Sequence, residues 1–160
     1  MIIDEDIVAG GVTPFIITKL IERHERERQR YRLLHDYYMG DHRILSRRKR
    51  GKNVANNRIM CNHAKYITDM TQSYLVGNPV TYAVSDEYDI EAIKNEYLEQ
   101  DMPSVDSEIV KNMSIYGKAY ELIYADEKSK PRSVRLDPEH TFVCYSQSAF
   151  EKPLFAVYYY

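Results

Sequence analysis

The longest helix that the sequence predicts is unusually rich in charge. Thr13-Pro14 is a typical helix start, because threonine caps the first turn and proline fits within it. Gly40 is a typical helix end. Between them the apolar stripe is narrow and is interrupted at His24 and Arg28, and residues 22–32 are almost entirely charged. A helix of this kind is exposed over much of its length or packs on another subunit.

Three further helices are predicted after this one. The first spans 57–76, with Asn57 or Asn62 as its possible cap, before a glycine and a proline end the pattern. One face of this helix carries Met60, Ala64, Ile67, Thr71 and Tyr74 at helical spacing. Two shorter, acidic helices follow, one starting near Asp86 or Asp89 and one at Pro103-Ser104. The segment 41–57 shows no clear period and predicts a loop, and alternating apolar residues predict a short strand near 79–84.

The last part of the chain predicts strands joined by short turns. They cover residues 119–125, 133–136, 141–145 and 154–160. Such short connections favour antiparallel pairing. The expected fold class is therefore α+β, with a long N-terminal helix and further helices followed by a mostly antiparallel sheet. We expect residues 1–160 to form a single domain or a partial domain, helical over 13–117 and strand-rich over 118–160. Because the chain ends in a strand-like aromatic run, we expect the full protein to continue beyond residue 160.

Charge is distributed unevenly along the middle of the chain. From Arg43 to Arg58 there are seven basic residues and no acids, whereas Ser85 to Glu108 holds nine acids and one base, Lys94. Two solvated faces explain this asymmetry without any partner. The alternative is electrostatic contact with nucleic acid or between copies of the protein. The candidate contact residues are Arg43, Arg47, Arg48, Lys49, Arg50, Lys52 and Arg58.

No pattern typical of an enzyme is present in the sequence. The five histidines and two cysteines show no metal-ligand spacing, and there is no glycine-rich phosphate loop. Asp126-Glu127-Lys128 weakly matches the acid and lysine of some nuclease sites, but a hairpin turn explains these residues better. We therefore expect no catalytic residues, no metal and no cofactor. No apolar run reaches the ~18 residues needed to cross a membrane.

Several short motifs resemble the N-terminal part of a tailed-bacteriophage portal protein of the siphovirus or prophage type. The resemblance lies in the order of the motifs along the chain and in the spacing between them. The motifs are Tyr37-Tyr38-x-Gly40-x-His42-x-Ile44, Asn56-Asn57-Arg58, Asn62-x-Ala64-x-x-Ile67, Gly77-x-Pro79-Val80, Ile115-Tyr116-Gly117-x-Ala119-Tyr120-Glu121 and Asp137-Pro138. Together these motifs cover about 120 residues of the chain.

The resemblance implies a structural protein and not an enzyme. Portal proteins form homo-oligomeric rings, usually of about a dozen subunits, at one capsid vertex. The implied partners are other copies of the chain, the terminase, scaffold and capsid proteins, head-completion proteins and double-stranded DNA in the channel. The implied location is the virion, with the bacterial cytoplasm during assembly. The N-terminal region of the family builds an outer wing, so no channel or motor-docking residue can be transferred to this chain.

Two hypotheses follow for the basic segment. In a closed ring each subunit contacts its neighbour through two different surfaces, so a basic loop facing the acidic helices of the next copy would set the register. The alternative is that the chain is a small, non-specific DNA-binding module that uses the basic loop 43–58. A metal-dependent nuclease built on Asp126 and Lys128 is a further alternative with little support in the sequence.

Overall fold

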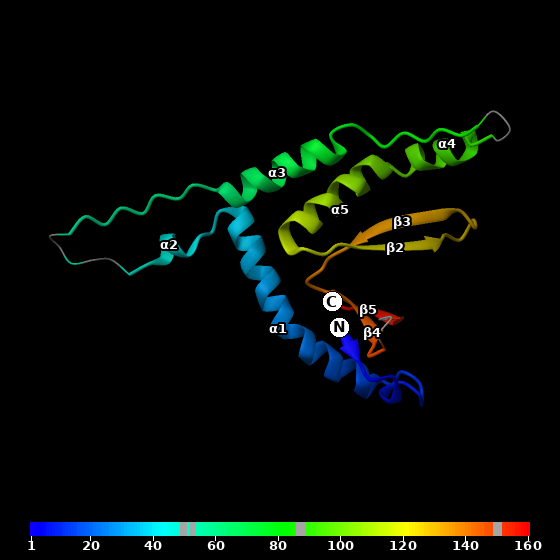
Figure 1. The fold of residues 1–160 in the computed structure, drawn as a ribbon, viewed down its shortest axis with the longest axis horizontal. Helices are drawn as coiled ribbons and strands as arrows, with labels where there is room; N and C mark the ends of the chain where they lie inside the picture. The colour runs from blue at the N-terminus through cyan, green and yellow to red at the C-terminus, as the bar shows by residue number, and fades with distance from the viewer. Residues whose placement is uncertain (49–50, 52–53, 86–88, 149–151) are drawn as a thin grey trace. The chain divides into compact units, whose positions relative to one another are not determined.

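A computed structural model describes the chain except for residues 49–50, 52–53, 86–88 and 149–151. The chain divides into two compact units (Figure 1). The first, which we call the sheet unit, contains Met1–Arg32 and Leu136–Tyr160, and the second, which we call the helical unit, contains Leu33–Arg135. The long helix α1 (Pro14–Met39) contributes its larger part to the sheet unit and its last residues to the helical unit.

The sheet unit contains three strands in the order β1-β4-β5. The central strand β4 (Thr141–Ser146) is antiparallel to β5 (Pro153–Tyr158), as the short connection predicts. It is also parallel to β1 (Ile2–Ile3), with Ile2 opposite Tyr145. The sequence did not indicate this parallel pair, because β1 and β4 are separated by most of the chain. A short 3-10 helix, η1 (Glu5–Ile7), follows β1.

The core of the sheet unit forms between this sheet and α1. Ile3, Leu20, Phe142 and Cys144 are buried there. His24 is only 1% exposed, and its ring lies 4.9 Å from that of Phe142. The interpretation of His24 as an interruption of the apolar stripe is therefore wrong. The imidazole packs with the apolar residues on the same face of α1.

Among the residues that the structure describes, the helical unit contains four further helices and a β-hairpin (Figure 1). Its elements are α2 (Arg43–Ser46), α3 (His63–Val76), α4 (Glu91–Glu99), α5 (Met102–Tyr116), β2 (Tyr120–Ala125) and β3 (Pro131–Leu136). Of the two possible caps it is Asn62 that accepts a hydrogen bond, from the Lys65 amide, so α3 begins at His63 and not at the predicted residue 57. Gly77 ends α3 as predicted. Gly117 ends α5 in the left-handed conformation at φ 74°.

Two further local predictions differ from the structure. The segment expected to be a loop over 41–57 contains the single helical turn α2. The strand expected near 79–84 is wrong, since within the described residues 79–85 form no strand. A strand needs a hydrogen-bonded neighbour, and here Tyr82 instead packs its ring on the edge of Tyr97 at 5.5 Å. The broader α+β prediction, with helices followed by a mostly antiparallel sheet, is confirmed.

Candidate assembly and nucleic-acid surface

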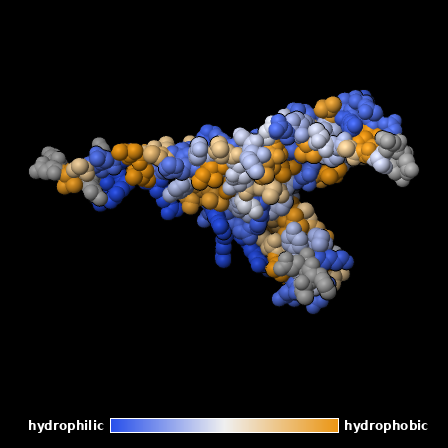
Figure 2. Space-filling model, turned by 45° about the horizontal axis from the view of Figure 1, so that its top comes forward, coloured by the Kyte–Doolittle hydropathy of each residue, from blue (hydrophilic) through white to orange (hydrophobic). Residues whose placement is uncertain are grey.

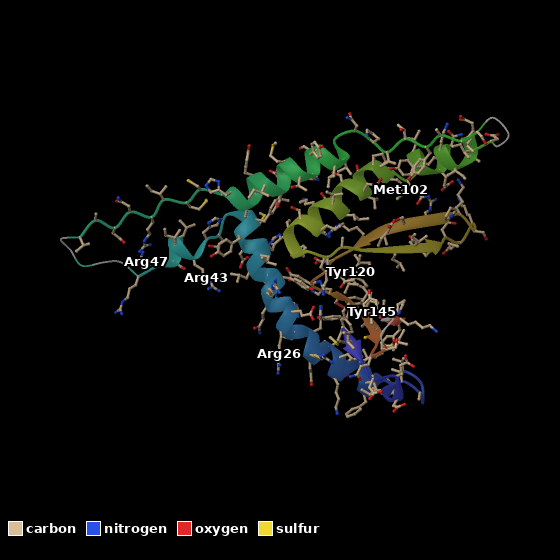
Figure 3. The ribbon with its side chains drawn as sticks, viewed as in Figure 1. Arg26, Arg43, Arg47, Met102, Tyr120 and Tyr145 are labelled. Carbon is tan, nitrogen blue, oxygen red and sulfur yellow. The ribbon has the colours of Figure 1, made fainter. Side chains whose placement is uncertain are left out.

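The basic residues predicted from the sequence lie on one segment, residues 43–58, which we call the basic arm. The arm leaves the end of α1 and returns to the start of α3 (Figure 1). Arg43 and Arg47, labelled in Figure 3, lie at the two ends of α2. Lys49, Arg50 and Lys52 lie outside the described residues. Among the described residues, Arg43, Arg47 and Arg48 form no ion pair, so these three guanidinium groups are available to an anionic partner.

Arg58 has a different role from the other arginines. Its Nη1 donates a hydrogen bond to the Leu45 carbonyl oxygen at 2.9 Å, which joins the end of the arm to α2. This contact holds the two sides of the arm together near its base. Of the residues proposed from the sequence, Arg58 is therefore better explained as an anchor than as a free cation.

A second anchor connects the end of α1 to the start of α3. Asn62 Nδ2 donates a hydrogen bond to the Tyr38 carbonyl oxygen at 2.9 Å. Gly40 makes this close approach possible, since its φ is +91° and a Cβ there would lie 3.2 Å from Asn62 Nδ2. His42 stacks on Tyr37 at 4.7 Å between ring centroids. The sequence indicated Asn62 only as a possible helix cap, and its contact with Tyr38 could not be found from local pattern.

A group of three polar side chains completes this junction. Lys65 Nζ lies 2.8 Å from Asp69 Oδ2, and the Tyr38 hydroxyl donates to Asp69 Oδ1 at 3.1 Å. The hydrogen bond with Asp69 raises the pKa of Lys65, and the same bond lowers the pKa of Asp69. Both shifts favour the charged forms, so Lys65 and Asp69 form an ion pair at the surface of this junction.

The acidic helices α4 and α5 are partly neutralised within the helical unit. Lys130 on the hairpin lies 3.3 Å from Glu96 and 3.2 Å from Glu99. Arg132, on β3, lies 3.7 Å from Glu96. The sequence showed only Lys94 as a base among these acids, because the other partners come from a hairpin that is distant in sequence. The acidic surface open to another molecule is therefore smaller than the composition indicated.

The residues considered for a nuclease site form a turn. Asp126 Oδ1 accepts hydrogen bonds from the backbone amides of Lys128 at 2.8 Å and Lys130 at 2.9 Å, and Oδ2 accepts from Arg132. The Lys130 amide is the main cause of the lowered pKa of Asp126. Glu121 accepts a hydrogen bond from the Ser133 hydroxyl. Within the described ranges no three histidine, cysteine or acidic side chains are grouped to hold a metal ion.

Within the part of the chain that the structure describes, no helix is both long enough and apolar enough to cross a membrane.

Comparison with known proteins decides which family these features belong to. The sequence model of the family described as "Phage portal protein, SPP1 Gp6-like" matches residues 17–160. The portal protein of Bacillus phage SPP1 is 31% identical to the chain over 157 residues, which cover 91% of this chain. The chain belongs to the phage portal protein family.

Membership of the portal family confirms the resemblance that the short motifs predicted. The family consists of structural phage proteins and not of enzymes. The chain spans only 30% of the length of the SPP1 portal protein, so it corresponds to a part of that relative.

Proposed function

We propose that the chain is the N-terminal part of a portal subunit that forms a closed ring of about a dozen copies at one capsid vertex. In this proposal DNA passes through the ring during packaging and release, and the ring joins the head to the tail. The observation that supports it is the family match over residues 17–160, together with the SPP1 relative that is itself a portal protein. In this proposal the full subunit continues beyond residue 160, and the match over only 30% of that relative supports a longer subunit.

The proposal also assigns partners and a location. The ring would contact the terminase during packaging, scaffold and capsid proteins at the vertex, and head-completion proteins afterwards. Its final location would be the virion, and it would assemble in the bacterial cytoplasm. The sheet unit and the helical unit would both belong to the outer wing of the ring.

Two experiments test the proposed function. The first is to read the encoding DNA past Tyr160, express the complete subunit and determine its mass by native mass spectrometry and its form by electron microscopy. We expect a closed ring of identical subunits. The second is to delete the gene in the phage or prophage, which should give capsids without DNA. A complete subunit that remains monomeric, or a deletion that leaves packaging intact, would contradict the proposal.

A second candidate function is DNA binding by the basic arm. The observation that favours it is that Arg43, Arg47 and Arg48 form no ion pair among the described residues. Clustered cations of this kind neutralise phosphates without reading the base sequence. Within a ring the same arm would contact either DNA or the acidic helices of the next copy. The salt dependence of DNA binding distinguishes these two contacts.

A further inference from the structure

The outer face of α3 is apolar. Figure 2 shows hydrophobic patches among hydrophilic ones at the surface, and several large side chains of α3 are exposed. Tyr74 is 88% exposed, and Tyr66, Ile67 and Met70 are each more than half exposed. These four residues lie at helical spacing on one side of α3, and we call them the α3 ridge. A continuous apolar face of this kind on a soluble protein marks a binding surface.

The inner face of α3 carries buried polar side chains beside its apolar ones. Thr68 is 5% exposed and receives a hydrogen bond from the Ser114 hydroxyl of α5 at 3.3 Å. Gln72 donates to the Ser107 hydroxyl at 2.8 Å, and Asn112 of α5 is also buried. A helix normally places its apolar residues against its own core. Because α3 presents these four residues outward, the ridge is open to a partner outside the helical unit.

A groove in the same unit can receive the ridge. It has a volume of about 440 Å³ and lies between α4 and the β2–β3 hairpin. Its apolar lining includes Ile93 and Tyr97 from α4, Met102 at the start of α5 and Ile123 from β2. The hairpin is fixed to α4 by Gln100, which donates to the Pro131 carbonyl oxygen at 2.8 Å. We call this feature the α4 groove, and its volume is in the range that accommodates large side chains.

The ridge and the groove lie on different sides of the helical unit. In Figure 1, α3 and the hairpin lie on opposite sides of α5. A single copy therefore presents both surfaces at once, which is the requirement for a head-to-tail contact that closes into a ring. A two-fold contact would instead need one surface that is complementary to itself.

Charge also favours this pairing. The ridge follows the basic arm, whose described residues hold four arginines and no acid. The described residues of 89–101 and 120–135, which form the groove and its border, hold eight acids against five bases. Lys130 pairs with Glu96 and Glu99 within the same unit, so the border of the groove keeps a small acidic excess. This difference in charge favours pairing of ridge with groove over pairing of ridge with ridge.

We propose that the α3 ridge of one copy inserts into the α4 groove of the next copy. The contact rests on the proposed ring and names the residues that would join its subunits. Tyr74 would be the main anchor, because it is the most exposed member of the ridge and aromatic anchors dominate such interfaces. The basic arm would then lie near the acidic border of the neighbouring groove.

Cross-linking of the complete subunit tests the contact. In a Cys61→Ser background, which removes the exposed native thiol, subunits carrying Tyr74→Cys are co-assembled with subunits carrying Ile93→Cys. A short bismaleimide should join the two kinds of subunit into dimers. The matched control pairs Ile93→Cys with Gln29→Cys, an exposed position on α1, and should give little product. Separately, Tyr74→Asp should lower the fraction of ring at least about tenfold while circular dichroism stays unchanged.

The outcomes separate this inference from the proposed function. The inference is overturned if rings form without the cross-link between residues 74 and 93, or if rings persist with Tyr74→Asp. Either result leaves the portal function in place. Cross-links between two Tyr74→Cys subunits show a two-fold contact and also overturn the inference. Slow maleimide labelling of Tyr74→Cys in the monomer shows that a later segment of the same chain covers the ridge. That result also overturns the inference. A complete subunit that never assembles overturns the proposed function and this inference together.

Discussion

His24 Nδ1 lies 2.9 Å from the hydroxyl oxygen of Tyr159, and this contact joins the charged helix α1 to the end of the sheet. The imidazole is buried, so the hydroxyl satisfies a polar group that water does not reach. We expect Tyr159→Phe to lower the free energy of unfolding by about 1–2 kcal/mol. Urea unfolding followed by circular dichroism measures this. Tyr160→Phe is the control, because Tyr160 is fully exposed and its change should have almost no effect.

A second prediction concerns alkaline pH. Burial is the main cause that raises the pKa of Tyr31 to about 12. An unfolded tyrosine ionises near pH 10, so below that pH the phenol is protonated in both states and contributes no pH dependence. Between pH 10 and 12 the unfolded state loses its proton and the folded state keeps it. Stability should therefore fall as pH rises through this window, by up to about 1.4 kcal/mol per pH unit.

The variant Tyr31→Phe isolates this contribution from that of other groups. It also removes the hydrogen bond to Glu27, which shifts stability at every pH. The quantity to compare is therefore the slope of the free energy of unfolding against pH between pH 10 and 12. The slope should be shallower in the variant than in the original chain. Equal slopes would show that Tyr31 titrates normally in the folded protein.

The anchor at the base of the basic arm gives a third prediction. Asn62→Ala removes both the cap of α3 and the hydrogen bond to the Tyr38 carbonyl, and should cost about 2–3 kcal/mol of stability. Gly40→Ala forces a side chain into the left-handed region and should cost about 1–2 kcal/mol. Asn57→Ala is the control, since Asn57 is exposed on the arm itself. Thermal unfolding of the three variants compares them, and equal midpoints would contradict the anchor.

The hairpin gives a fourth prediction through Gln100. Its side chain donates to the Pro131 carbonyl and accepts a hydrogen bond from the Ser133 amide at 3.1 Å. Gln100→Ala should lower stability by about 1–2 kcal/mol and speed hydrogen exchange at the Ser133 amide. Lys128→Ala, at the exposed turn of the same hairpin, should leave that exchange rate unchanged. If both variants exchange alike at Ser133, Gln100 does not hold the hairpin.

Local features of this fold could be predicted from the sequence because neighbouring residues determine them. Thr13-Pro14, Gly77 and Gly117 mark helix ends in the sequence, and the structure places helix ends there. For the start of α3 the sequence left Asn57 and Asn62 open, and the structure shows Asn62. The hairpin turn at Asp126 was also predictable, since its carboxylate accepts hydrogen bonds from amides only two and four residues later.

Features that depend on distant contacts could not be predicted in this way. The pairing of Ile2 with Tyr145 joins opposite ends of the chain, and Lys130 reaches acids more than 30 residues away. The orientation of α3 is the clearest case. Its spacing indicated an apolar face with Ile67 and Tyr74, and only the packing of Thr68 on α5 shows that this face points outward. Sequence periodicity identifies the face of a helix and leaves open which surface covers it.

The last prediction separates the two hypotheses for the basic arm. The arm variant carries Arg47→Glu and Arg48→Glu, which reverses two charges that form no ion pair among the described residues. The charge-matched control carries Arg26→Glu and Arg30→Glu, at two exposed positions on α1. If the arm contacts the acidic border of the next copy, the arm variant should lower the fraction of ring, and DNA affinity should equal that of the control. If the arm contacts DNA, rings should persist, affinity should fall, and the slope of log affinity against log salt should become shallower by about 0.9 for each lost phosphate contact. Two results together would contradict both hypotheses: rings that stay intact in the arm variant, and a DNA affinity of the original subunit that does not change with salt. The arm would then be a solvated surface segment whose described arginines have no electrostatic partner in the assembly.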